Sequence, residues 1–324
     1  MFLHLPPLPL VHFPSRKPSS PEPLSLLFHT FEGSVLGHLR SLVLAPAGDG
    51  RPAVSFSYLS RAVDVLSSIH VLSDALVSDP SLAGSDDPAL ASYVASTISL
   101  LDVCNAVSAE VERLRRGRLL LLFAAHLLSP GASPDKIRRA RDSIREWRGS
   151  APRPRISSAA DLVRDLARRG APARGKMSAL GRAIYAVEDA SALIAGALVA
   201  SLGGEVDLAE RAKVPGERFA WGEAFDELRV ALSGEIRGRC AGEAADVEAS
   251  VRRLVEIMDD PAGDGGEKAE ERLREAVKEV EDAAEELSVG LDGLGGAVNA
   301  LFRTVLGSRN TALRSFRLPP NKCK

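Results

Sequence analysis

The last third of the chain carries a regular apolar pattern that a long helix can bury along one side. Apolar residues recur in alternating steps of four and three between residues 273 and 305. The positions are Leu273, Val277, Val280, Ala284, Leu287, Leu291, Leu294, Val298, Leu301 and Val305. This heptad seam favours one face of an antiparallel bundle within the chain over a dimerising coiled coil. Four glycines between residues 290 and 296 would each cost an isolated helix up to about 1 kcal/mol relative to Ala.

Most of the remaining chain has the same helical character. Ala, Leu, Arg and Glu dominate, apolar residues recur at three and four, and period-two runs of β-branched residues are almost absent. Further helices are predicted over residues 24–44, 55–78, 88–128, 133–148, 157–169, 178–202 and 218–258, with a linker over 149–155. Long helices joined by short connections predict an all-α fold, an elongated antiparallel helical bundle.

The two ends of the chain differ from this helical region. Residues 1–23 contain seven prolines, which exclude the uninterrupted apolar helix of a secretory signal. The stretch is only weakly Ser- and Arg-rich, so it departs from the pattern of a plastid transit peptide. We interpret it as a disordered Pro-rich tail, followed by a single helical domain over residues 24–317 and a short tail over 318–324.

The composition excludes two broad classes of protein. Of 324 residues, 45% are hydrophobic, which is too many for a chain that stays disordered throughout. The three cysteines, Cys104, Cys240 and Cys323, are too few and too widely spaced for a disulfide scaffold or a metal site. This usage suits a reducing compartment. We therefore expect a cytoplasmic protein that is not secreted.

The formal net charge of -2 conceals strong segregation of charge along the chain. Residues 1–112 carry a net charge of -6, the basic middle 113–182 carries +13, the acidic helices 205–300 carry -13, and residues 301–324 carry +6. Blocks of opposite sign indicate electrostatic complementarity, either within the fold or with a partner. In the first case the Arg-rich helices lie beside the Glu-rich ones and form exposed ion pairs of about 0.2–1 kcal/mol each.

In the second case, arginines of the basic middle bind an anionic lipid surface or an acidic protein, each charge contributing about 1 kcal/mol near a membrane. The candidate residues are Arg113, Arg115, Arg116, Arg118, Arg138, Arg139, Arg141, Arg145 and Arg148. Nucleic acid is a less suitable partner, because the basic block contains only Phe123 and Trp147 as aromatic residues on which bases could stack.

The segment 183–204 links the basic and acidic blocks and is the most apolar part of the chain. Residues 190–204 carry no charge. A membrane span needs about 20 apolar residues, and reaching that length brings in Glu188 and Asp189 at a cost of about 2.5 kcal/mol or more for an acid near the bilayer centre. We favour a buried central helix and keep a single membrane span, in the endoplasmic reticulum or the plasma membrane, as the alternative.

No pattern of catalytic residues stands out. The six histidines all lie in the first 126 residues, and none is spaced for metal binding. We expect no metal and no cofactor. Cys104 has no sequence neighbour that would activate it, and His126 follows an apolar run, so both are interpreted as core or boundary residues. An enzyme with its site inside the bundle, acting on a small apolar precursor, remains an alternative.

Several stretches, taken in order, match one known group of proteins. They are residues 100–110 (LLDVCNAVSAE), 118–126 (RLLLLFAAH), 175–176 followed by 182–187 (RAIYAV), 219–225 (FAWGEAF) and 302–313 (FRTVLGSRNTAL). Their order and spacing resemble the plant BYPASS family over about residues 24–317. None of these stretches is a catalytic signature, and the family offers no catalytic residues to carry over.

The resemblance implies a non-enzymatic regulator or adaptor in plant development. Such proteins restrain a root-derived mobile signal that arrests shoot growth, and relatives have been linked to membranes, including the endoplasmic reticulum. We therefore expect action at a membrane surface, with protein partners and anionic lipid as the binding partners. A homodimer through the seam at 273–305 is a separate expectation.

Overall fold

The computed structural model describes residues 23–43, 54–78, 88–128, 132–149, 154–169, 177–210, 214–236, 241–259 and 267–317. In these residues the regular secondary structure is entirely helical. The helices are α1 (Pro23–Arg40), α2 (Phe56–Val77), α3 (Pro88–Leu127), α4 (Pro134–Gly149), α5 (Pro154–Arg169), α6 (Ala179–Ser201), α7 (Gly222–Ile236), α8 (Gly242–Asp259) and α9 (Glu267–Arg317). The tails predicted at 1–23 and 318–324 lie outside the described residues, apart from Pro23.

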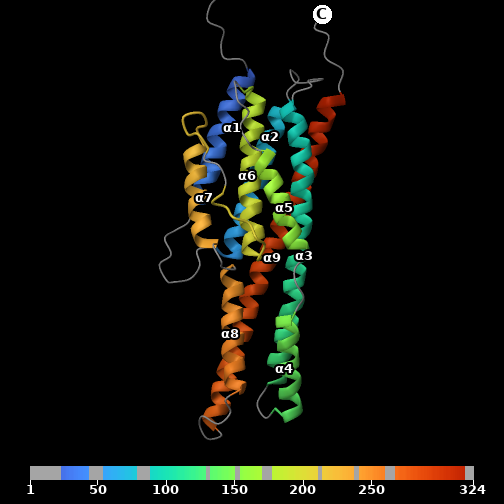
Figure 1. Ribbon diagram of the computed structural model, residues 1–324, viewed down its shortest axis with the longest axis vertical. Coiled ribbons are helices and arrows are strands. Elements are labelled where there is room, and N and C mark those ends of the chain that lie inside the picture. Colours follow the sequence, from blue (N-terminus) through green and yellow to red (C-terminus); the bar gives the residue numbers. More distant parts are fainter. Residues whose placement is uncertain are drawn as a thin grey trace, which may run out of the picture.

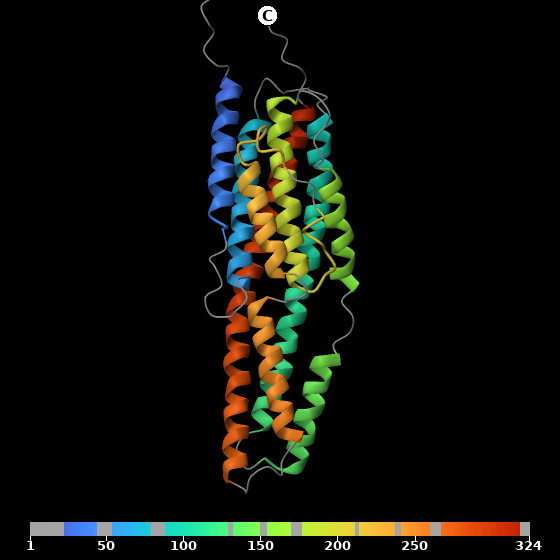
Figure 2. The ribbon, with the colours of Figure 1, turned by 60° about the vertical axis from the view of Figure 1, so that its left-hand side comes forward.

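The helices form an elongated bundle, as predicted (Figure 1). Two long helices run through its whole length: α3 with 40 residues and α9 with 51, about 60 and 75 Å at 1.5 Å per residue. The upper half also contains α1, α2, α5, α6 and α7, and in the lower half α4 and α8 accompany the two long helices (Figure 2). The molecule is therefore thick at one end and narrows to four helices at the other.

Helix α6 occupies the interior of the upper half. It packs against α1, α2, α3, α5 and α7, and nearly every side chain from Leu180 to Ser201 is buried. Gly196 lets Leu208 pack directly against the backbone of α6, because a Cβ at this position would lie 2.7 Å from Cδ2 of Leu208. The segment 183–204 thus forms the buried central helix that we favoured from the sequence.

Polar caps and prolines explain where several helices begin. The Oγ atoms of Ser55 and Ser178 accept hydrogen bonds from the backbone N–H of Tyr58 and Gly181, which caps α2 and α6. Helix α5 begins at Pro154, inside the linker predicted over 149–155. Proline suits this position because the first turn of a helix does not need its missing N–H.

The predicted helix over 218–258 is wrong, because the structure has two helices in its place. Helix α7 ends at Ile236 in the upper half, and α8 begins at Gly242 and runs down the lower half (Figure 1). At the junction the backbone N–H groups of Ala241 and Gly242 donate to the carbonyls of Ser201 and Val54. Contacts with distant parts of the chain therefore replace the helical hydrogen bonds that would have continued α7.

The heptad seam lies on α9 and faces the interior of the bundle. Helix α9 packs against α2, α3 and α8, and Leu291, Leu294, Leu301 and Val305 are fully buried. The seam is thus used within the chain, as the bundle interpretation predicts. A homodimer through 273–305 stays a prediction, which light scattering would test.

Candidate functional site

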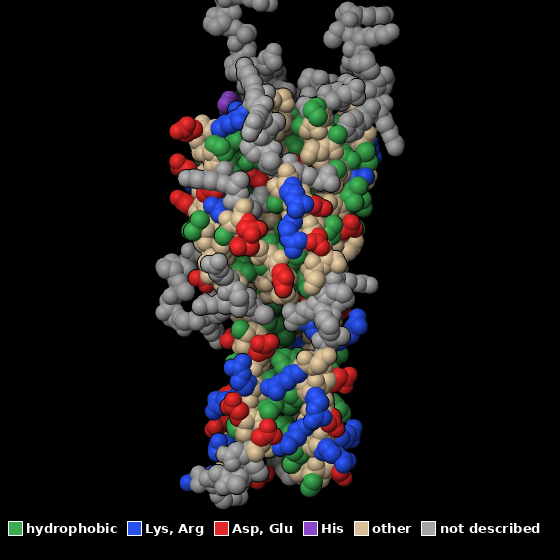
Figure 3. Space-filling model, in the orientation of Figure 1, with side chains coloured by type: hydrophobic (Ala, Val, Ile, Leu, Met, Phe, Trp, Pro, Cys, Tyr) green, Lys and Arg blue, Asp and Glu red, His purple; other side chains and the backbone are tan. Residues whose placement is uncertain are grey.

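The nine candidate arginines lie on the lower part of α3 and on α4, and they fall into three groups. Lys and Arg side chains are conspicuous over the narrow lower half of the molecule, interspersed with acidic ones (Figure 3). Arg113, Arg115 and Arg118 form ion pairs with acids on α3 or α9. Four arginines form an exposed stripe on α4, and Arg116 and Arg139 lie by the outward side of α3.

Two arginines of the first group join α3 to α9, and the third forms an ion pair within α3. Arg115 forms an ion pair with Asp292 at 2.6 Å, and Arg118 forms one with Glu285 at 2.7 Å. Arg118 also donates from Nε to the carbonyl oxygen of Ala284, 3.1 Å away. Arg113 pairs with the buried Glu110 on its own helix. The basic and acidic blocks therefore meet here, so these arginines are not available as a free cationic surface.

The second group forms a stripe on α4. Arg138, Arg141, Arg145 and Arg148 recur at steps of three, four and three, which places them along one side of the helix. Arg141 turns to the neighbouring helix, where it contacts the carbonyl of Met258 and forms an ion pair with Asp259 at 3.1 Å. Within the described part of the chain, Arg138 and Arg145 form their ion pairs with acids one turn away on α4, and all four arginines are exposed. Such exposed pairs hold their partners weakly.

The third group lies beside apolar surface. Arg116 is exposed on α3, and the guanidinium carbon of Arg139 lies 5.7 Å from the centre of the Phe123 ring. At this distance a guanidinium group is attracted to the face of the ring. Phe123 itself is 44% exposed, so the arginine and the ring are both presented to solvent.

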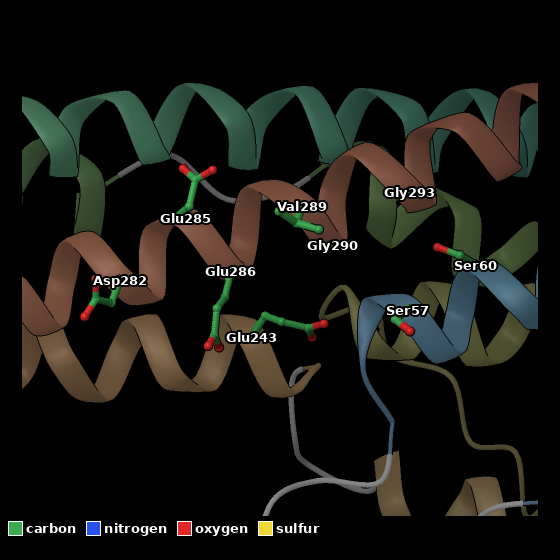
Figure 4. A pocket seen from close by; sticks show the side chains of 9 residues that line it. All are labelled: Ser57, Ser60, Glu243, Asp282, Glu285, Glu286, Val289, Gly290 and Gly293. Carbon is green, nitrogen blue, oxygen red and sulfur yellow. The ribbon is translucent and has the colours of Figure 1, made fainter.

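A second feature, which the sequence reasoning missed, is an acidic groove of about 930 Å³ between α2, α8 and α9. Its lining is Ser57, Ser60, Glu243, Asp282, Glu285, Glu286, Val289, Gly290 and Gly293. Figure 4 shows the Glu243 side chain extending from α8 towards the start of α2 and Glu286 extending from α9 towards α8, while Glu285 points to the opposite side, towards α3. The groove brings α8 and α9 together with α2, which lies far from them in the sequence, so no local motif could have revealed it.

Glu243 also has a structural role in this groove. Both of its carboxylate oxygens accept the backbone N–H of Phe56, at 3.1 and 3.0 Å. The carboxylate therefore satisfies a donor in the first turn of α2, where a negative charge is favourable. Within the described part of the chain, no group of three or more His, Cys, Asp or Glu is arranged to hold a metal ion.

Structural roles for Cys104 and His126 were also predicted from the sequence. Cys104 is buried, as expected, and burial raises the pKa of its thiol to about 12. His126 is exposed on α3, so its interpretation as a core or boundary residue is wrong. The histidine in the core is His70, whose two ring nitrogens lie 3.1 Å from the Tyr93 hydroxyl and 3.2 Å from the Ser191 hydroxyl.

Among the described residues, two helices are long and apolar enough to cross a membrane by length and composition. Helix α6 reaches a mean hydropathy of 1.6 over its most apolar window, of which 94% is buried inside the bundle. Helix α3 reaches 1.4, but only half of its window is buried. Glu188 and Asp189 are buried on α6, and Ser92 of α3 donates a hydrogen bond to Glu188 at 2.9 Å.

Known proteins similar to this chain come from plants. The Arabidopsis thaliana protein named "Protein BPS1, chloroplastic" is 26% identical over 306 residues, which are 90% of this chain and 84% of the relative. The chain is BYPASS-like. Two rice proteins named UPF0496 protein 4, from Oryza sativa subspecies indica and japonica, are each 32% identical over 249 residues, 71% of this chain.

The matched region spans about half the length of the rice relatives, 54% of each. No family model matches the BYPASS-like chain. No solved structure matches it either. These relatives are plant proteins, and the arginines and the groove are features of this chain's own structure.

Proposed function

We propose that this BYPASS-like chain is a non-enzymatic regulator or adaptor that acts at an anionic membrane surface. The observation that carries the proposal is the exposed basic surface of α4, formed by Arg138, Arg145 and Arg148. Because three other arginines of the same block already pair with acids of α3 and α9, the exposed ones are the part of the block that an anionic partner can reach. Each would contribute about 1 kcal/mol near an anionic membrane.

Sedimentation with vesicles tests this proposal. We expect the chain to bind phosphatidylcholine vesicles that contain phosphatidylserine, and to be released as salt is raised, because salt screens exposed charges. Changing Arg138, Arg145 and Arg148 together to Glu should abolish the binding. The matched control changes Arg252, Lys268 and Arg272 to Glu, since these cations are also exposed but lie on the acidic helices α8 and α9. Equal loss in both triple variants would contradict a specific role for α4.

We also propose that the chain restrains a root-derived mobile signal that arrests shoot growth, because it is similar to BPS1 over 90% of its length. Complementation tests this role. Expression in the roots of an Arabidopsis plant that lacks BPS1 should restore shoot growth, and the α4 triple variant should fail to do so at equal abundance. Persistent arrest with the wild-type chain would contradict the proposal.

For location, we propose the cytoplasmic face of the endoplasmic reticulum or the plasma membrane. The Arabidopsis relative is named chloroplastic, so microscopy of a fusion at either end of the chain should include a plastid marker. A single span through α6 is the alternative. It would have to expose to lipid a helix that five others now cover, and resistance to carbonate extraction would support it.

A further inference from the structure

A short stripe on the outward side of α3 combines exposed apolar and basic side chains. Arg116, Leu119 and Phe123 recur at steps of three and four, which places them on one side of the helix. Leu119 is 61% exposed and Phe123 is 44% exposed. Two large apolar side chains one turn apart form a patch, and exposed patches mark interaction sites more often than single exposed residues do.

Cationic groups flank this patch. Arg116 is exposed at one end of the stripe, and Arg139 reaches from α4 to the ring of Phe123. The acid on the same side of α3, Glu112, is in contact with the guanidinium of Arg115. The apolar pair is therefore bordered by two arginines, and the neighbouring acid has a cation of its own. We refer to Arg116, Leu119, Phe123 and Arg139 as the α3 stripe.

Three exposed valines lack this combination. Val289 is 67% exposed on α9, but it lies in the acidic groove beside Glu285 and Glu286. Val71 on α2 and Val230 on α7 are also exposed, and no cation–aromatic contact is found beside either in the described residues. The α3 stripe thus differs from these three valines in the cationic groups beside it.

We propose that the α3 stripe inserts into the interface of an anionic bilayer, with Leu119 and Phe123 at the acyl boundary and Arg116 and Arg139 at the lipid phosphates. This inference rests on the proposed function and adds an apolar contact to the charge attraction of α4. Amphipathic surfaces that bind lipid interfaces combine apolar residues such as Leu and Phe with arginines in this way. Arginine can bury its apolar stem there while its guanidinium reaches the phosphates. In this arrangement the lower half of the bundle lies along the membrane, and its α3 side faces the lipid.

Vesicle partitioning of a double variant tests the insertion. Changing Leu119 and Phe123 together to Ser should weaken binding to phosphatidylserine-containing vesicles about 10- to 100-fold, since each side chain would be largely buried in the interface. The control is Val289→Ser, which removes an equally exposed apolar residue and should leave binding unchanged. All three positions are exposed, so circular dichroism should show the same helix content for each protein.

A depth measurement gives an independent readout. In Phe123→Trp the new indole should be quenched by brominated phosphatidylcholine when phosphatidylserine is present, beyond the quenching seen with the wild-type chain. Val289→Trp should show no such excess. The excess should also decrease when phosphatidylserine is omitted, because the arginines then lose their anionic partners.

The outcomes separate this inference from the proposed function. If the α4 triple variant loses binding while the Leu119 and Phe123 variant binds like the wild type, the insertion is refuted and the electrostatic proposal stands. If the wild-type chain binds no anionic vesicles, both proposals fail. Equal quenching of Phe123→Trp and Val289→Trp would likewise overturn the insertion.

Discussion

At the scale of single residues, the buried His70 shows how the core restricts charge. Its ring is 1% exposed and lies between the Tyr93 and Ser191 hydroxyls. Burial lowers the pKa of His70 from 6.5 to about 4, because the charged imidazolium would lose its hydration. The histidine is therefore neutral in the folded chain at neutral pH. Its role is that of a hydrogen-bonded core residue joining α2, α3 and α6.

This shift predicts a pH-dependent stability. The pKa of His70 is lower in the folded than in the unfolded chain, so its contribution is fully present above pH 6.5 and is lost as the pH falls towards about 4. Over this pH range, we expect the free energy of unfolding of the wild-type chain to fall by up to about 3 kcal/mol more than that of His70→Gln. Urea unfolding of both proteins at several pH values measures this difference.

The control for this prediction is His126→Gln, because His126 is exposed on α3. It should follow the wild-type chain at every pH. A stability difference between wild type and His70→Gln that stays constant with pH would show that His70 does not titrate in this way.

Glu243 permits a second prediction at this scale. Its carboxylate accepts the backbone N–H of Phe56 and so joins the start of α8 to the start of α2. Glu243→Ala should lower the free energy of unfolding by about 1–2 kcal/mol, as the loss of a helix cap does. Glu286→Ala, in the same groove but exposed, should change it by less than about 0.5 kcal/mol. Equal effects of the two changes would refute the capping role.

At the scale of elements, α6 depends on small residues where it meets its neighbours. A Cβ on Gly196 would lie 2.7 Å from Leu208 and 3.4 Å from Val163 and Val206. Gly196→Val should therefore destabilise the chain by about 1–3 kcal/mol or more through overpacking. Gly37 on α1 has open space around it, so Gly37→Ala should instead stabilise the chain by about 0.5–1 kcal/mol. Thermal unfolding measures both shifts, and a stabilising Gly196→Val would contradict the packing.

The same scale shows what periodicity can and cannot predict. The seam on α9 was predictable because its apolar residues keep the same alternation of four- and three-residue steps over ten positions. In contrast, residues 119–123 of α3 are all apolar, so periodicity could not separate the exposed Leu119 and Phe123 from the buried Leu121. The break between α7 and α8 was missed because it depends on hydrogen bonds to Ser201 and Val54. The acidic groove likewise depends on three helices meeting in space.

At the scale of the whole molecule, the two halves of the rod differ in how much they bury. Helix α6 in the upper half buries 20 residues, whereas α4 in the lower half buries Ala140, Ser143 and Ile144. A region of a protein unfolds locally less often when it has more buried apolar contacts. The end that carries the exposed arginines should therefore open more readily than the end that contains the core.

Hydrogen exchange followed by mass spectrometry measures this difference. Amides of α4 should exchange faster than those of α6 and of the part of α9 near Leu291 and Leu294, which are fully buried. Anionic vesicles should slow exchange in α4 and in the outward turn of α3 at Leu119 and Phe123, and leave α6 unchanged, because only the lower half touches lipid in the proposed arrangement. Protection of α6 by vesicles, with no change in α4, would instead indicate that the apolar core helix enters the bilayer.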